Sequence, residues 1–402
     1  MRSDSSTDFG RKIAFLRKKL GYSQAEFAQK VGRSETWVSQ VERGVRRIDR
    51  MSVLERVADA LDTEVGELTP EKSWPLAQTG KPAAATELAL TLASNHALQA
   101  LPKSPQPVDI PGIEERTSHA WKLAHSAQYE ELAILLRDLI TEVETASDQA
   151  GNETPPAVRQ SRARMYLAAS AMLAKLGEFD AAWVAIDRAT ASAHTLKNAH
   201  LLAECAFRLA IVFQASRRFD MARRVAGDAA NALSQTYPQG DSDPATYALL
   251  GALHLQLATA SARSGDGDAA YRYLNDAREA AEHVHDGRND YNTEFGPTNV
   301  SLHEVAVAVE LGDAGRALRV AEQIDDGRLS AERQGRFLID VASASAQLRR
   351  TDAVINALRR SFTVSPQQAR SHSRARTLIA DLLRSHGDDP RVKELAGQVT
   401  SN

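Results

Sequence analysis

Several features that define common protein classes are scarce in this sequence. Among 402 residues there is one cysteine, Cys205, which excludes an internal disulfide framework and favours a reducing compartment. Aromatic residues make up only 5%, and no stretch shows the sustained alternation of a half-buried strand. No run approaches the roughly 18 apolar residues of a membrane-spanning helix, and the N-terminus shows no apolar signal core. We therefore expect an all-α, cytoplasmic protein that has no membrane partner.

Motifs of catalysis and metal binding are also missing. The sequence contains neither a GxGxxG nor a phosphate-binding loop, and no Ser/His/Asp constellation stands in a distinctive context. His283 and His285 are two residues apart, which puts them on different faces of a helix and argues against a metal site. Cys205 lies among alanines and leucines, as a buried thiol would. We expect no enzymatic activity, no cofactor and no metal.

Charge is distributed unevenly along the chain. The net charge of −3 would by itself argue against a nucleic-acid-binding protein. Residues 11–50, however, contain eleven basic and four acidic residues, so this segment carries 11 − 4 = +7 and the remainder −10. A basic N-terminal segment on an acidic body favours a nucleic-acid-binding head.

The segment SQAEFAQKVGRSETWVSQVERG, residues 23–44, has the spacing of a helix-turn-helix. Ser23 and the glutamate three residues later form a capping box, and Ser34 can cap the next helix. Gly32 lies between them, where a tight turn needs a positive φ. A preceding helix is indicated by apolar residues at helical spacing: Phe9, Ile13, Leu16 and Leu20. The inward faces of the two motif helices supply a small core: Phe27, Ala28, Val31, Val38 and Val41.

This segment resembles the phage-repressor and Cro-type (XRE) family of helix-turn-helix DNA-binding domains. The resemblance covers roughly Phe9 to Leu68, where SQAEFAQKVG, SETWVSQVERG and ERVADAL fit in order and spacing. It implies a five-helix domain in which Arg17 and Glu42 form an internal ion pair. It further implies that Gln24 holds a phosphate and that Glu35, Thr36 and Gln40 read bases in the major groove. The other DNA contacts expected along the backbone or minor groove are Arg33, Ser39, Arg43, Arg46, Arg47 and Arg50.

Composition and repeats divide the rest of the chain. We expect the head to occupy residues 1–69, a Pro/Ala-rich linker with one helix residues 70–115, and helical repeats residues 116–402. Four segments share a helix, a turn and a second helix with small residues at its contact face: LAKLGEFDAAWVAIDRA, FQASRRFDMARRVAGDAA, ASARSGDGDAAYRYLNDA and AVELGDAGRALRVAEQI. They resemble degenerate tetratricopeptide repeats spaced by about 40 to 50 residues. With two weaker copies, we predict six hairpins over about 118–362 and a capping pair.

Stacked hairpins curve into a superhelix whose concave surface is lined by the first helix of each pair. Asn299 follows a helix-starting proline, and it either binds the backbone of an extended peptide or caps its own helix. Counting back from each turn places six candidate ligand contacts on the concave face: Tyr166, Phe207, Arg208, Arg263, Asn299 and His303. The alternative for Tyr166 and Phe207 is packing in the core, and the alternative for Arg208 and Arg263 is an exposed, solvated side chain.

Two functions fit this organisation. The first is a sequence-specific transcriptional regulator, a homodimer on a palindromic operator in double-stranded DNA, whose repeats bind a peptide or small-molecule effector. Its architecture resembles that of bacterial peptide-pheromone-sensing regulators. We would then expect a protein associated with the nucleoid when it is bound to DNA. The alternative is a constitutive protein-docking scaffold that is recruited to DNA without a small ligand.

Overall fold

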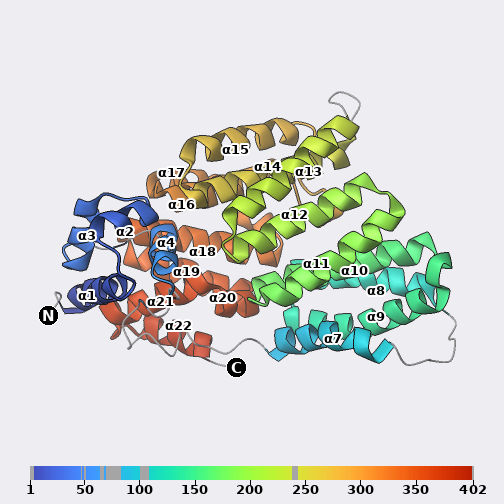
Figure 1. Ribbon diagram of the computed structural model, residues 1–402, viewed down its shortest axis with the longest axis horizontal. Coiled ribbons are helices and arrows are strands. Elements are labelled where there is room, and N and C mark those ends of the chain that lie inside the picture. The colour runs from blue at the N-terminus through green and yellow to red at the C-terminus, as the bar shows by residue number, and fades with distance from the viewer. Residues whose placement is uncertain are drawn as a thin grey trace.

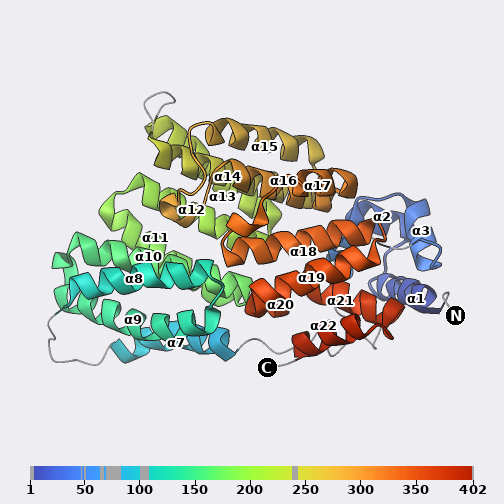
Figure 2. The ribbon, with the colours of Figure 1, turned by 180° about the vertical axis from the view of Figure 1, so that it is seen from behind.

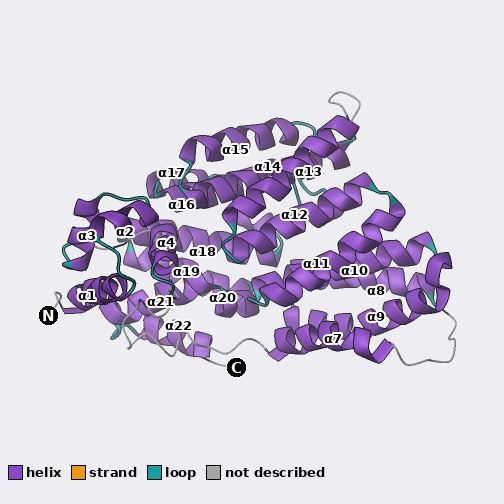
Figure 3. Ribbon diagram, viewed as in Figure 1, coloured by secondary structure: helices purple, strands orange, loops and turns teal. Residues whose placement is uncertain are grey.

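The computed structural model describes residues 4–46, 48, 51–63, 68, 83–99, 108–237 and 243–400. Over these ranges every regular element is an α-helix or a short 3₁₀ helix, and none is a strand (Figure 3). The predicted all-α fold is therefore confirmed. Of the helices described, none is long and apolar enough to cross a membrane.

Four helices form the N-terminal head, drawn in blue at one end of the molecule in both views (Figures 1 and 2). The capping box begins the second of them, because the Ser23 side chain accepts from the Glu26 N–H at 3.1 Å and the Glu26 carboxylate accepts from the Ser23 N–H at 2.7 Å. Gly32 ends it with φ at 61°. These local predictions are confirmed. The helices are α1 (Asp4–Lys19), α2 (Gln24–Val31), α3 (Glu35–Glu42) and α4 (Met51–Ala60).

The head encloses its own apolar core. Phe27, Val31, Val38 and Val41 are almost completely buried there, as predicted. The core also depends on a residue that the sequence analysis missed, because a side chain added at Gly10 would come within 2.4 Å of the Val41 carbonyl oxygen. Glycine thus lets α1 lie directly against the end of α3. The fifth helix of the expected domain falls after residue 63, outside the described residues apart from Leu68.

Six helical hairpins follow, as predicted, although the array begins slightly earlier than expected, at Ile110. A short helix and a last pair close it. The bounds are α8 (Ile110–His125) with α9 (Tyr129–Ala150), α10 (Pro156–Lys175) with α11 (Phe179–Leu196), α12 (Ala199–Ala215) with α13 (Phe219–Thr236), α14 (Pro244–Ser264) with α15 (Gly267–Ala281), α16 (Pro297–Leu311) with α17 (Ala314–Ala321), α18 (Ala331–Gln347) with α19 (Thr351–Val364), then α20 (Pro366–Ser371), α21 (Ser373–His386) and α22 (Pro390–Thr400). The 3₁₀ helices are η2 (Gly151–Glu153), η3 (Asp290–Asn292) and η4 (Asp326–Arg328).

Each of the six hairpin turns has one residue in the left-handed conformation. At Gly177, Gly265 and Gly312 this residue is glycine, for which positive φ carries no steric penalty. The other three turns have Ala127, Arg217 and Arg349 at the same place, with φ of 55°, 63° and 59°. The missing glycines are one reason why the repeat is hard to recognise in the sequence.

This difference predicts that Arg349→Gly stabilises the protein. Arg349 is exposed and has φ at 59°, so glycine removes a left-handed penalty of about 1 kcal/mol without losing buried contacts. Thermal unfolding should show a small rise in the melting temperature. Arg350→Gly is the matched control: its φ is −89°, and glycine there should lower stability by a few tenths of a kcal/mol. Equal effects of the two substitutions would contradict this interpretation.

One helix precedes the hairpins, within the segment that was expected to link the two domains. It is α7 (Ala83–Gln99), and its Ala85, Leu88 and Leu92 are buried in the same cluster as α8 to α11. The Leu92 carbonyl accepts a hydrogen bond from Arg188 of α11 at 3.0 Å. The apolar core of the repeats therefore extends back to α7.

The hairpins curve until the two ends of the array meet, and α20 lies beside the first hairpins in both views (Figures 1 and 2). The side-chain carbonyl of Gln367 in α20 accepts from the backbone N–H groups of Tyr129 and Glu130, at 2.7 and 3.2 Å. These N–H groups belong to the first turn of α9, where the helix itself provides no acceptor. Lys175 of α10 makes a second bridge, to Glu332 of α18 at 2.6 Å. The array thus encloses its concave face.

Candidate DNA-binding face and ligand cavity

The second helix of the motif, α3, presents one polar face outward. Ser34 caps α3 by accepting from the Trp37 N–H at 3.2 Å, and the buried side of α3 packs into the head core. On the opposite side Glu35 and Thr36 are exposed, while Ser39 and Gln40 are half-buried. An exposed polar face of this length fits the major groove of DNA, which admits one α-helix.

A buried ion pair holds α3 against α1, as the resemblance implied. Arg17 donates to both carboxylate oxygens of Glu42, at 2.5 and 3.0 Å, and both side chains are about 93% buried. The Gln24 amide donates to the same carboxylate at 2.7 Å. Gln24, the expected phosphate contact, is therefore fixed at the N-terminus of α2 by the same carboxylate that positions α3.

The remaining basic candidates surround this face. Arg33 is half-buried and stacks 5.8 Å above the ring of Trp37. Arg43 is exposed, with its Nε donating to the Ser39 carbonyl at 3.2 Å, and Arg46 is exposed as well. Arg47 and Arg50 lie outside the described residues. The described cations therefore flank α3, where phosphates would pass.

The head also contacts the repeat array. Asp59 of α4 pairs with Arg217 at 2.7 Å, and Arg217 is the left-handed residue of the turn between α12 and α13. At the corresponding turn between α14 and α15, a side chain added at Gly265 would lie 3.1 Å from Arg56 of α4. Helix α4 thus rests on two neighbouring hairpin turns.

The concave side of the array contains a cavity of about 1560 Å³. The first helices of all six hairpins contribute to its lining, as predicted for stacked repeats, and so do α20, α21 and other segments. Asp59 and Thr63, at the end of α4, border the cavity as well, so the head and the cavity adjoin. Five of the six candidate ligand contacts line it: Phe207, Arg208, Arg263, Asn299 and His303.

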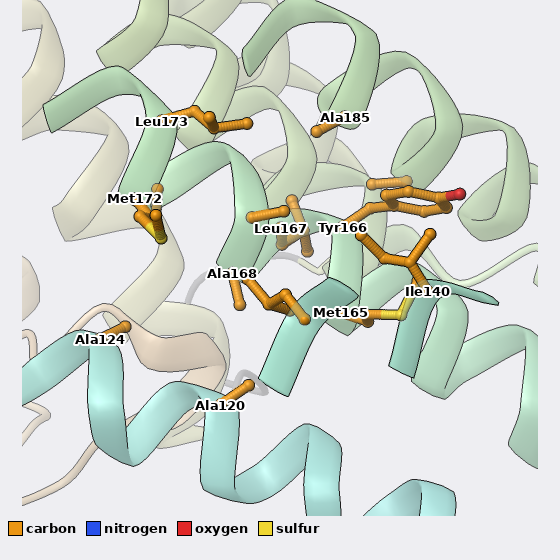
Figure 4. Close-up of a cluster of buried hydrophobic side chains, with 14 of the residues drawn as sticks. Ala120, Ala124, Ile140, Met165, Tyr166, Leu167, Ala168, Met172, Leu173 and Ala185 are labelled. Atoms are coloured by element: carbon orange, nitrogen blue, oxygen red, sulfur yellow. The ribbon is translucent and has the colours of Figure 1, made fainter. Parts of the chain in front are cut away.

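The placement of Tyr166 on the concave face was wrong. Its ring is fully buried beside Ile140, Leu167 and Ala185 (Figure 4), and its hydroxyl lies 2.6 Å from Glu144. Of α10, only the C-terminal part from Ser170 onward lines the cavity, so Tyr166 is too early in the helix to reach it. Tyr166 instead packs between α9 and α11.

The capping alternative for Asn299 was wrong, whereas its peptide-binding role stays a prediction. Gly296 occupies the N-cap position of α16, so Asn299 does not cap the helix. Its side-chain oxygen accepts a hydrogen bond from Arg333 of α18, a residue the sequence analysis did not single out. His303 lies one turn further, with Nδ1 3.0 Å from the Asn299 carbonyl. Burial lowers the pKa of His303 to about 3, so this ring is neutral at physiological pH.

Both arginine candidates are less exposed than the sequence suggested. Arg208 is only 8% exposed, with its guanidinium 4.8 Å above the ring of Trp121. Burial lowers the pKa of Arg208 to about 10, which leaves it charged at neutral pH. Arg263 pairs with Glu310 at 3.3 Å. The cavity wall is therefore strongly charged, but much of that charge is already engaged.

The sequence also led us to expect a buried thiol at Cys205 and no metal site. Cys205 is 2% exposed, and burial raises the pKa of its thiol to about 12, as expected for a core residue. The described residues contain no group of three His, Cys, Asp or Glu side chains that could hold a metal ion.

Comparison with known proteins agrees with the geometry of the head. A model of the helix-turn-helix domain matches residues 8–71. The HTH-type transcriptional regulator YazB of Bacillus subtilis, itself uncharacterized, is 36% identical over 62 residues, which are 15% of this chain and 88% of YazB. The chain belongs to the HTH-type transcriptional regulators. These matches confirm the predicted resemblance of the head to the phage-repressor-type helix-turn-helix family.

Other relatives are matched over a smaller share of their length. The HTH-type transcriptional regulator SinR of Bacillus subtilis is 36% identical over 63 residues, which are 16% of this chain and 57% of SinR. A Rap protein, solved in complex with competence and sporulation factor, aligns with 90% of this chain and 100% of its own. Its identity is 12% and its TM-score 0.49.

Proposed function

We propose that this regulator binds a specific operator in double-stranded DNA through α3 and that its cavity binds a peptide or small-molecule signal. One observation carries the proposal: the exposed polar face of α3, on a head whose residues 11–50 carry a net charge of +7, is joined to a cavity of about 1560 Å³. The proposed role is regulatory and not enzymatic.

The head by itself covers one half-site. Repressors with this motif place two recognition helices about 34 Å apart on a palindromic operator. We therefore propose a homodimer as the DNA-binding species. Sedimentation of the purified protein at concentrations near its DNA affinity tests this, because a monomer that binds a palindrome without self-association would contradict it.

The contact between α4 and the hairpin turns provides a physical route between the two sites. Asp59 both borders the cavity and pairs with Arg217 of the repeats. A ligand that binds two arrangements of the turns with different affinity would shift the position of the head. Operator affinity, measured with and without fractions of culture extract, tests this coupling. If no peptide or metabolite fraction changes the affinity, the sensing half of the proposal fails.

Gln40→Ala tests the assignment of the reading face. Gln40 is only half-buried and sits on the outward side of α3, so its loss should leave the fold intact. We expect a loss of about 1–3 kcal/mol in operator binding and a relaxed preference at one base pair. Fluorescence anisotropy on a set of single-base operator variants measures both.

Arg46→Ala is the matched control, since Arg46 is exposed beyond the end of α3. It should weaken binding to all sequences alike and reduce the salt dependence of affinity. Unchanged sequence preference in Gln40→Ala would mean that α3 docks differently from our proposal.

A further inference from the structure

A short segment before α16 forms part of the cavity lining. We define residues Asn289–Glu294 as the strap. Its residues Asn292, Thr293 and Glu294 line the cavity, although they belong to the connection between α15 and α16 and not to any helix pair. Tyr291, Asn292 and Glu294 have φ of 51°, 55° and 45°, a backbone that non-glycine residues rarely adopt. Contacts from the surrounding helices hold this backbone in place.

The carboxylate of Glu294 is the most heavily bound group of the strap. Its Oε2 lies 2.7 Å from Arg333 Nε, 3.1 Å from His125 Nδ1 and 3.2 Å from the Ser330 hydroxyl. His125 belongs to α8 and Arg333 to α18, so one carboxylate connects the first hairpin with the sixth. Burial alone would raise the pKa of Glu294, but the hydrogen bond from His125 and the charge of Arg333 lower it, so the group is ionised at neutral pH.

The backbone of the strap is bound in the same way. The Thr293 carbonyl accepts from Arg333, and the Asn292 carbonyl accepts from Arg208 at 2.6 Å. Arg333 also donates to Asn299. The side chains that the sequence analysis placed on the concave face, Arg208 and Asn299, are thus connected to the strap directly or through Arg333.

These contacts have the chemistry of a peptide receptor with its peptide already present. Two successive backbone carbonyls and a carboxylate are bound by His125, Arg208 and Arg333. We propose that these three residues form a carboxylate-binding site, that the strap is its built-in occupant, and that the external ligand is a peptide whose acidic side chain or C-terminus replaces the Glu294 carboxylate. This inference rests on the proposed function, because it names the ligand class of the same cavity.

The strap also sets a requirement for the ligand. An intramolecular occupant competes at a local concentration of the order of mM, so a bare carboxylate cannot displace it efficiently. A ligand that displaces the strap well below millimolar concentration must gain further contacts elsewhere in the cavity. Arg336 offers one: it is exposed, it lines the cavity, and it makes no hydrogen bond or ion pair with any described residue.

The first test removes the built-in carboxylate and supplies it from solution. Glu294→Ala deletes a fragment of the size of acetate, and acetate should then raise the melting temperature of the variant saturably, by about 2–4 °C. Glu294→Gln fills the same space without charge and should show no such rise, nor should the wild type. Acetamide and sodium chloride at equal concentration control for neutral binding and ionic strength. An equal response of all three proteins to acetate, or no response, would overturn the proposal.

The second test uses the wild type, so it does not depend on a variant that folds. The probes are two amidated, acetylated tripeptides that copy residues 292–294, Asn-Thr-Glu and its Asn-Thr-Gln analogue. At millimolar concentration the first should accelerate hydrogen exchange at the amides of the strap several-fold, and the second should not. Equal exchange with both probes would overturn the proposal.

The two proposals fail in different ways. Absence of acetate rescue and of strap displacement would remove the carboxylate site and leave DNA binding untouched. Absence of sequence-specific DNA binding by the wild type would remove the proposed function, whereas rescue of Glu294→Ala would still establish the carboxylate site.

Discussion

Glu42→Ala is expected to unfold the helix-turn-helix head. Arg17 is only 6% exposed and loses its ion-pair partner, while Gln24 loses its acceptor. Leaving one member of a buried pair uncompensated costs about 3–5 kcal/mol. Hydrogen exchange should show lost protection in α2 and α3 while the hairpins stay protected, and operator binding should disappear.

Glu35→Ala is the control for this variant. Glu35 begins the same helix but is exposed, so its loss should change the stability by no more than about 0.5 kcal/mol. It should nevertheless alter DNA binding if Glu35 reads a base. Full protection of the head in Glu42→Ala would show that the Arg17–Glu42 pair does not hold α3 in place.

Arg333→Met is expected to destabilise the repeat array. Its guanidinium is bonded to the Glu294 carboxylate, the Thr293 carbonyl and the Asn299 side chain, and its side chain is only 17% exposed. Methionine keeps most of the volume but leaves a largely buried carboxylate with one cationic partner fewer. We expect a loss of about 3 kcal/mol in the free energy of unfolding, measured by denaturant titration.

Arg316→Met provides the matched comparison on a neighbouring hairpin. Arg316 pairs with Glu304 at 2.7 Å, but its side chain is 39% exposed, so solvent screens the pair. The expected cost is below about 1 kcal/mol. Similar losses for the two variants would indicate that Arg333 acts only as a surface ion pair and that the strap is not anchored through it.

Much of the head could be predicted from the sequence because its signals are local. The capping box at Ser23, the left-handed Gly32 and the cap at Ser34 each need only a few neighbouring residues. The Arg17–Glu42 pair spans 25 residues and was accessible only through the family resemblance. Gly10 was missed because close approach of two helices leaves no pattern in one sequence.

The repeat array was predictable in number of hairpins but less so in detail. Glycine marks the turns at Gly177, Gly265 and Gly312, while the turn at Arg349 has no such signal. Tyr166 was assigned by counting back from a turn, and this count cannot tell which part of α10 the cavity reaches. The periodicity correctly predicted a helix, but the Tyr166 side chain faces the neighbouring helices and not the cavity.

The strap and the closing contacts could not be predicted at all. Glu294 meets His125 across 169 positions of sequence (294 − 125), and Gln367 meets Tyr129 across 238. Such pairs arise from the curvature of the whole array, to which every hairpin contributes a small rotation. The segment before α16 reads as an ordinary polar loop. Only its position inside the closed array shows that it occupies the proposed ligand site.

The most direct test of the central claim is selection of DNA from a random pool of duplexes by the full-length protein, followed by sequencing. The wild type is predicted to enrich one two-fold symmetric motif, with half-sites about one helical turn apart. The same selection with Gln40→Ala should return a motif that is degenerate at symmetric positions and otherwise unchanged. Recovery of no motif by the wild type, at salt concentrations where it binds DNA, would contradict the account.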